Sequence, residues 1–155
     1  MTEKLIVLFS VNNFQLGIDI FQVKEIVRMV SIDKIPRQPA FIEGVINFRG
    51  EFTPVIDLRK RFLFKGYQEW NSNSRIIIVY YNERKLGLIV DEVHSVEKKE
   101  VHYNLDIYVD KLFIKEHFVE SVCENENGIV VNIKIDELFS DVEADLDRKS
   151  TRLNS

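Results

Sequence analysis

The chain has 155 residues, of which 45% are hydrophobic and 30% are charged, and its formal net charge is −4 at pH 7. This length suits one domain, and the composition excludes a wholly disordered chain. The acidic excess argues against a nucleic-acid-binding protein, because phosphate binding requires a basic face. No apolar run approaches the roughly 20 residues of a membrane span, and the N-terminal segment does not have the pattern of a signal peptide. We therefore expect a cytoplasmic protein that does not insert directly into a membrane.

Short β-rich runs that end in turn residues dominate the sequence. Asn12-Asn13, Asn82-Glu83 and Glu126-Asn127-Gly128 each separate two such runs and indicate hairpins. Arg49-Gly50-Glu51 indicates a fourth hairpin, in which the glycine takes a positive φ. The predicted strands cover residues 5–11, 14–18, 45–48, 52–56, 75–81, 85–90, 93–96, 118–123 and 129–135. The run at 75–81 is β-branched and aromatic after its leading arginine, which predicts a strand buried on both faces.

Three short helical pieces interrupt the predicted strands. Asp19 can cap a helix that runs from residue 20 to residue 27. Residues 58–62 suit one or two helical turns, and Asp136 can cap a short amphipathic helix near the end of the fold. The polar segment 65–74 is expected to form a mobile loop.

About ten strands with tight turns in so short a chain favour small barrels over one wide sandwich. Two barrels packed against each other would use this many strands and leave few free edges. We therefore predict an all-β domain over residues 1–142. The remaining residues, 143–155, lack apolar periodicity and predict a disordered tail, part of which we expect not to be native sequence.

A series of motifs in this chain resembles the CheW family. The resemblance runs from residue 5 to residue 140 and is most specific between Gly44 and Arg59, where the sequence reads GVINFRGEFTPVIDLR. The other matching motifs are Gly17-Ile18-Asp19-Ile20, Val23-Lys24-Glu25-Ile26, Ile35-Pro36, Pro39-Ala40-Phe41-Ile42-Glu43 and Gly87-Leu88-Ile89-Val90-Asp91-Glu92-Val93.

The resemblance implies a fold of two intertwined five-stranded SH3-like β-barrels with a few short helices. It implies a chemotaxis adaptor that couples the cytoplasmic tips of methyl-accepting, transmembrane chemoreceptors to the regulatory domain of the histidine kinase CheA. Receptor contact is then expected in a hydrophobic groove between the barrels, and kinase contact at an outer barrel end. The resemblance implies no catalytic activity and no cofactor, and a place in membrane-associated receptor arrays.

Arg49 is the first candidate for a partner contact. It stands at a predicted turn, where a long cation reaches solvent, beside Gly50, which lets a partner backbone come close. Arginine is also over-represented in interface hot spots. The alternative is an intramolecular salt bridge, for example to Asp57 across the hairpin. Asn47 can bond to neighbouring backbone and hold this turn, whereas Gly44 and Gly50 are expected to set backbone geometry more than to touch a partner.

Val23, Glu25 and Ile26 are the other candidates, because this segment is similar to the kinase-facing surface of the family. On the predicted helix Ile20, Val23 and Val27 can cover the core, which leaves Glu25 outward and Ile26 on the flank. The alternative is that all the aliphatic side chains of this segment belong to the core.

Two acids of the sequence are candidate catalytic groups. Asp57 and Asp91 each end a predicted strand, where an acid commonly caps the following turn or helix. The three histidines of the chain show neither a catalytic triad nor metal-ligand spacing. A rival hypothesis is nevertheless a small barrel enzyme or ligand-binding protein. It requires Asp57, Asp91 and Arg49 to converge in one cleft, within about 4–6 Å of one another.

Three further features have alternative interpretations. The basic run Arg59-Lys60-Arg61 predicts a solvated helix face, or else a contact with an acidic partner. Trp70 either folds back onto a barrel or anchors a partner. Cys123 cannot form an intramolecular disulfide and is expected to be a small buried hydrophobe. Within the family, the chain could also serve a different signalling array, such as one that controls surface motility or gene expression.

Overall fold

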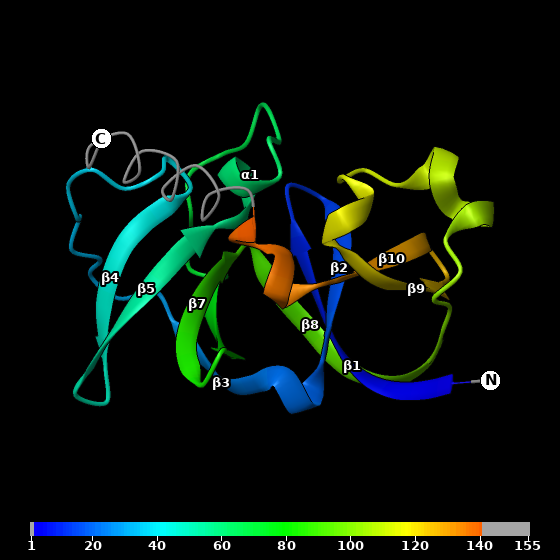
Figure 1. Ribbon diagram of the computed structural model, residues 1–155, viewed down its shortest axis with the longest axis horizontal. Helices are drawn as coiled ribbons and strands as arrows, with labels where there is room; N and C mark the ends of the chain where they lie inside the picture. Colours follow the sequence, from blue (N-terminus) through cyan, green and yellow to red (C-terminus); the bar gives the residue numbers. More distant parts are fainter. Residues whose placement is uncertain (1, 141–155) are drawn as a thin grey trace, which may run out of the picture.

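The computed structural model describes residues 2–140, which form two five-stranded sheets with short helices between some of the strands (Figure 1). The strands are β1 (Thr2–Val11), β2 (Phe14–Asp19), β3 (Val23–Arg28), β4 (Ile42–Phe48), β5 (Glu51–Asp57), β6 (Arg75–Tyr81), β7 (Arg84–Val90), β8 (Glu92–Val101), β9 (Val119–Asn125) and β10 (Gly128–Ile133). The helices are α1 (Leu58–Arg61) and the 3₁₀ helices η1 (Ile20–Gln22), η2 (Asp106–Lys111), η3 (Glu116–Phe118) and η4 (Ile135–Glu137). The predicted tail, 143–155, lies outside the described residues.

The two sheets share the chain in an intertwined way. The first sheet has the strand order β8-β1-β2-β10-β9, and the second has the order β3-β6-β7-β5-β4. The chain therefore begins in the first sheet, completes the whole second sheet, and returns to finish the first. Figure 1 shows the two units side by side, with β4, β5 and β7 on the left and β1, β9 and β10 on the right. The predicted all-β fold of two intertwined five-stranded units is confirmed.

A short backbone pairing joins the two outermost strands of each sheet. In the second sheet the segment after β3 pairs with β4, through reciprocal hydrogen bonds of 2.9 and 2.8 Å between Asp33 and Val45. In the first sheet the segment after β8 pairs with β9 in the same way, through His102 and Val122 at 2.8 and 2.9 Å. Both sheets consequently close into barrels, which leaves few unpaired strand edges among the described residues.

The tight hairpins follow from their turn residues. In the turns Asn12-Asn13, Arg49-Gly50 and Asn82-Glu83 both residues have positive φ, between 46° and 81°. This is the geometry of a type I′ turn, whose twist matches that of the flanking strands. Asparagine and glycine tolerate it well, whereas Arg49 and Glu83 take a conformation that most other residues disfavour. The predicted positive φ of Gly50 is confirmed.

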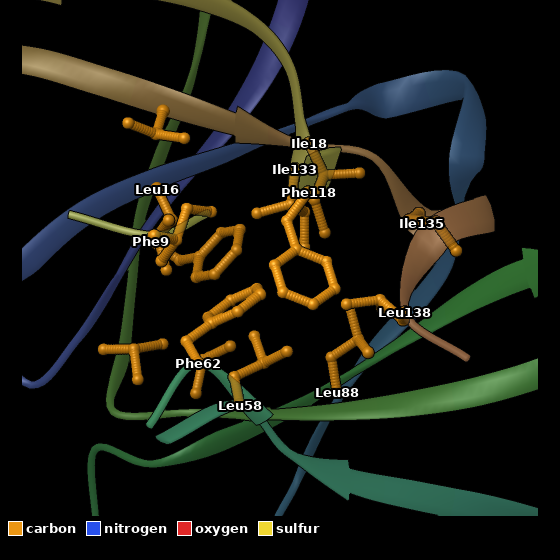
Figure 2. Packing of buried hydrophobic residues seen from close by; sticks show 14 of the residues in the cluster. Phe9, Leu16, Ile18, Leu58, Phe62, Leu88, Phe118, Ile133, Ile135 and Leu138 are labelled. Atoms are coloured by element: carbon orange, nitrogen blue, oxygen red, sulfur yellow. The ribbon is translucent and has the colours of Figure 1, made fainter. Parts of the chain in front are cut away.

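One continuous hydrophobic cluster joins the two barrels. Phe62, at the end of α1, packs edge-on against Phe118, which precedes β9, with 5.2 Å between the ring centroids. Figure 2 shows side chains from both barrels meeting in this cluster, among them Phe9, Ile18, Leu58, Phe62, Leu88 and Phe118. Burial of so much apolar surface between the barrels fixes them as one rigid body.

Strand β6 is buried on both faces, as predicted. Ile77 and Val79 belong to the cluster between the barrels, whereas Ile76 and Ile78 face a second cluster on the other side of the strand. Successive side chains of a strand point to opposite faces, so a strand between two apolar layers needs an unbroken apolar run. Cys123 is fully buried in a third cluster in the first barrel, as expected.

The predicted extent of the helix after Asp19 and the predicted cap by Asp136 are wrong. Asp19 does cap a helix, since its carboxylate accepts a hydrogen bond from the Phe21 N–H, but that helix ends at Gln22. Residues 23–28 form β3 instead, because pairing with β6 in the second barrel overrides the helical spacing of the apolar residues. Near the end of the fold η4 begins before Asp136, and the residue at its N-terminus, Lys134, makes no side-chain cap. Within residues 2–140, no helix has the length and apolar character of a membrane span.

Candidate functional site

The hairpin between β4 and β5 places Arg49 at an outer end of the second barrel. The Asn47 side chain holds this turn, since its Oδ1 accepts a hydrogen bond of 2.9 Å from the Gly50 N–H. This bond closes the turn one residue after Arg49 and fixes the direction in which the arginine leaves the strand. The predicted role of Asn47 is thereby confirmed as a structural one.

Arg49 forms a two-point ion pair with Glu25 on β3. Its Nε lies 3.1 Å from Oε2 of Glu25, and its Nη2 lies 2.7 Å from Oε1. The pair links β3 to the turn that follows β4, and these two strands are the outermost strands of the second sheet. The predicted alternative of an intramolecular salt bridge is therefore confirmed, but its acid is Glu25 and not the suggested Asp57. The Arg49 side chain remains 67% exposed and that of Glu25 31%, so both can also meet a partner.

The pairing changes the acid–base properties of both groups. The hydrogen bond from Arg49 lowers the pKa of the Glu25 carboxyl, and the same bond raises the pKa of the Arg49 guanidinium. Because folding lowers the pKa of Glu25, the ionised Glu25 carboxylate stabilises the folded state at neutral pH. That contribution is lost as the pH falls through the folded-state pKa of Glu25. Both groups of the pair are therefore charged at neutral pH.

The remaining candidates on β3 differ in accessibility. Ile26 is 38% exposed, although it lies in the middle of a paired strand. Val23 is partly buried and packs against the cluster between the barrels, which makes it a supporting residue more than a contact. We define the Arg49 face as Glu25, Ile26, Asn47, Arg49 and Gly50. Hydrogen bonds join Glu25 to Arg49 and Asn47 to Gly50, whereas Ile26 follows Glu25 on β3 and its side chain points to the other side of that strand.

Gly44 closes the barrel beneath this face. A Cβ atom built on Gly44 would lie 2.2 Å from the backbone oxygen of Asp33, which pairs with Val45. Only glycine allows the two segments to approach this closely. No heavy atom lies within 4 Å of a Cβ built on Gly50, so at this position only the positive φ favours glycine. Both residues set backbone geometry, as predicted.

Comparison with known proteins identifies the family. Residues 5–143 match the family model described as the CheW-like domain. The chain belongs to the CheW-like family. The chemotaxis protein CheW of Treponema pallidum is 30% identical to it over 146 residues, which cover 87% of this chain and 84% of that protein. The crystal structure of the scaffolding protein TtCheW from Thermoanaerobacter tengcongensis matches with a TM-score of 0.80 and 42% identity, covering 90% of this chain and 89% of that one.

Two further CheW proteins match over a shorter stretch. The chemotaxis protein CheW of Bacillus subtilis is 45% identical over 94 residues, and that of Klebsiella aerogenes is 37% identical over 89 residues. The matched region covers 59% and 53% of those two relatives and 61% and 57% of this chain. The resemblance inferred from the motifs is confirmed, and the match to TtCheW agrees with the predicted SH3-like double barrel.

Phe52 is a surface residue that the motifs did not single out. It lies directly after the Arg49 turn and is 76% exposed, whereas the next residue, Thr53, is buried. The alternation of inward and outward side chains along β5 could have identified Phe52. Because Thr53 points into the barrel, the preceding aromatic ring must point outward. Close by, Lys85 forms an ion pair with Glu51 at 2.9 Å. An exposed aromatic ring beside charged groups is typical of a protein contact.

The basic run in α1 is not a solvated face. Arg59 is buried and bonds to both carboxylate oxygens of Asp57, at 3.0 and 3.1 Å. Its guanidinium lies over the rings of Tyr67 and Trp70, 4.2 and 4.4 Å from their centroids. These contacts hold the loop 65–74 against the second barrel, which confirms that Trp70 folds back. Lys60 is partly exposed and pairs with Glu43 at 3.1 Å.

Arg61 lies between the barrels instead of in solvent. Its guanidinium is 4.7 Å from the ring centroid of Phe41 and 4.5 Å from that of Phe118. Its Nε also donates a hydrogen bond to the carbonyl of Leu138, near the C-terminal end of the described chain. A cation that stacks on aromatic faces and binds a carbonyl can be partly buried at low cost.

The three residues of the enzyme hypothesis do not converge. Asp57 binds Arg59 and caps α1, accepting a hydrogen bond from the Arg59 N–H. Asp91 accepts a hydrogen bond of 2.6 Å from the backbone of Asn12 in the first barrel. Arg49 pairs with Glu25 at the outer end of the second barrel. Each acid has a structural partner of its own, and the closed cleft that the enzyme hypothesis requires is not formed by these residues.

Proposed function

We propose that this chain is a chemotaxis adaptor, which couples transmembrane chemoreceptors to the histidine kinase CheA by protein–protein binding. The observation that supports it most strongly is membership of the CheW-like family over residues 5–143, with relatives named as chemotaxis proteins and as a scaffolding protein. Its site of action is the cytoplasm, where it joins membrane-associated receptor arrays through its partners.

The Arg49 face is the proposed site for the regulatory domain of CheA. Arg49 offers a planar set of donors to carbonyl or carboxylate groups, while Ile26 and the neighbouring Phe52 offer apolar surface. Gly44 and Asn47 support this face by holding the barrel and the turn beneath it. The cytoplasmic tip of a receptor is proposed to bind between the two barrels.

Mechanically, the adaptor works as a rigid connector and not as a catalyst. The cluster between the barrels joins them without an intervening linker, so a displacement of the receptor at one surface moves the kinase-binding surface as well. Interfaces of this kind bury on the order of 1,000 Å² or less and are individually weak. Several such contacts together make the array cooperative. This function uses no cofactor and no catalytic group.

Replacing Arg49 with glutamate tests the function and the site together. In co-sedimentation with receptor-bearing membranes and CheA, the unaltered chain is expected to carry kinase into the pellet. Arg49→Glu is expected to weaken kinase binding at least about tenfold, because a desolvated charge contact becomes a repulsion. Circular dichroism should show an unchanged fold, since the residue is exposed.

Two controls separate the partner contact from the ion pair. Lys98→Glu breaks a comparably exposed pair with Glu3 on the first barrel, and it should leave co-sedimentation unchanged. The double variant Arg49→Glu/Glu25→Arg restores an ion pair of reversed polarity but should not restore kinase binding. Normal co-sedimentation of Arg49→Glu would contradict the assigned site. A pellet that gains no kinase from the unaltered chain would contradict the adaptor function.

A further inference from the structure

The two barrels have equivalent strand orders but differ inside at one end. In the second barrel Gly87 on β7 pairs in parallel with Val55 on β5. At the equivalent position of the first barrel, Gly17 on β2 pairs in the same way with Asn132 on β10. A position that holds an apolar side chain in the second barrel therefore holds an amide in the first. A Cβ atom built on Gly17 would overlap Oδ1 of Asn132, so only glycine makes room for this amide.

Asn132 is almost completely buried, and its hydrogen bonds are incomplete. The residue is 3% exposed, and its Nδ2 donates a hydrogen bond of 3.0 Å to Oγ of Ser121, which is equally buried. Its Oδ1, in contrast, has no hydrogen-bond partner among residues 2–140. Folded proteins pair nearly all of their buried polar groups, so an unpaired buried acceptor indicates a donor that comes from outside the chain.

Asn132 and Ser121 line a cavity of about 270 Å³ at this end of the first barrel. The mouth of a β-barrel is a common place for a small-molecule site. The charged side chains that line the cavity are of both signs. Lys4 and Asp19 form an ion pair of 3.1 Å. The other charged residues are exposed and form no ion pair within residues 2–140; they are Lys134, Glu120 and Asp136.

These groups fit a small ligand that carries both charges. An ammonium group is a stronger donor to the amide oxygen of Asn132 than a neutral group is. A carboxylate can accept hydrogen bonds from Lys4 and Lys134. The cavity is lined by two lysines and three acids, so a ligand with a single charge leaves the groups of the same sign uncompensated. Its volume is slightly below that of a typical drug-sized pocket, which limits the ligand to a small molecule.

We propose that this cavity binds a small zwitterion of the α-amino-acid class. Its ammonium group donates to Oδ1 of Asn132, and its carboxylate accepts from Lys4 and Lys134. No residue of the Arg49 face lines the cavity. The binding goes beyond the proposed adaptor function and involves this chain alone, so either can fail without the other. Because Asp19 also caps η1, which leads into β3, the ligand lies beside the segment that connects the two barrels.

Amide spectra of the isotope-labelled full chain, titrated with L-alanine, test the proposal. Saturable shifts are expected at Gly17, at Ser121 and in the side-chain amide of Asn132, and none at Arg49. Two analogues of L-alanine serve as matched probes: ethylammonium lacks the carboxylate, and propionate lacks the ammonium group. Each should bind at least about tenfold more weakly, because it leaves one set of groups in the cavity unpaired.

Two variants test the assigned contacts. Asn132→Val introduces the residue type of the second barrel, so circular dichroism should show an unchanged fold while the Kd for L-alanine rises at least about tenfold. Lys134→Ala changes an exposed residue and should also raise the Kd. Lys111→Ala removes the same charge from an exposed position that does not line the cavity, and it should leave the Kd unchanged.

Three results would overturn the proposal. The first is the absence of a saturable shift at Asn132 with L-alanine up to about 50 mM, the weak limit for so small a ligand. The second is binding of ethylammonium or propionate as tight as that of L-alanine. The third is a Kd for L-alanine that neither Asn132→Val nor Lys134→Ala raises above that of the Lys111→Ala control.

Discussion

Gly44→Ala is expected to lower the free energy of unfolding by about 3 kcal/mol, the combined effect of overpacking and of an unfavourable φ. The new methyl group would lie 2.2 Å from the backbone oxygen of Asp33, so the pairing of Asp33 with Val45 has to open. That pairing closes the second barrel beneath the Arg49 face. The variant should therefore lose kinase binding as well as stability, which urea denaturation and co-sedimentation measure separately.

Gly50→Ala is the matched control for this prediction. Its φ of 81° is also unfavourable for alanine, but no heavy atom lies within 4 Å of the added Cβ. The expected loss is about 1 kcal/mol, from backbone conformation alone. Equal losses for the two variants would show that the contact with Asp33 is not what makes Gly44 necessary.

Asp57→Asn is expected to lower the free energy of unfolding by about 3 kcal/mol, because it leaves the buried Arg59 guanidinium without its counter-charge. Asparagine has almost the same shape, and its oxygen can still cap α1, so the loss reports the missing charge. Trp70 is the only tryptophan and lies over the Arg59 guanidinium. Its fluorescence should shift to longer wavelength if the loop 65–74 leaves the barrel.

The double variant Asp57→Asn/Arg59→Met checks the cause of that loss. Methionine removes the unpaired cation and keeps an apolar chain against the rings of Tyr67 and Trp70. It should recover most of the stability that the single substitution loses, since replacing a whole buried pair is often close to neutral. A double variant less stable than Asp57→Asn would mean that the stacking and the bond to the Gln68 carbonyl matter more than the charge.

Features encoded by a few neighbouring residues were predictable from the sequence. The turns at Asn12-Asn13 and Arg49-Gly50, the bond that Asn47 makes to its own turn, and the cap that Asp57 provides for α1 are all local. The doubly buried strand β6 was also predictable, because its composition reflects its surroundings directly. The motifs then identified the family, and with it the intertwined barrels.

Features set by contacts between distant residues were not predictable. The segment 20–27 has apolar residues at helical spacing, yet long-range pairing with β6 makes its second part a strand. Glu25 and Arg49 were separate candidates, and only the closed barrel brings them together. The sequence alone predicts that Arg59 and Arg61 are solvated, because the aromatic rings that cover them come from other parts of the chain.

Mapping the contact with the kinase tests most directly whether this chain is an adaptor that works through the Arg49 face. The regulatory domain of CheA is titrated into the isotope-labelled chain, and the amide signals are followed. We predict saturable shifts centred on Glu25, Ile26, Asn47, Arg49 and Gly50, and none in the Arg49→Glu variant. Saturable shifts that leave these residues unmoved, or no shifts with excess kinase domain, would contradict the account.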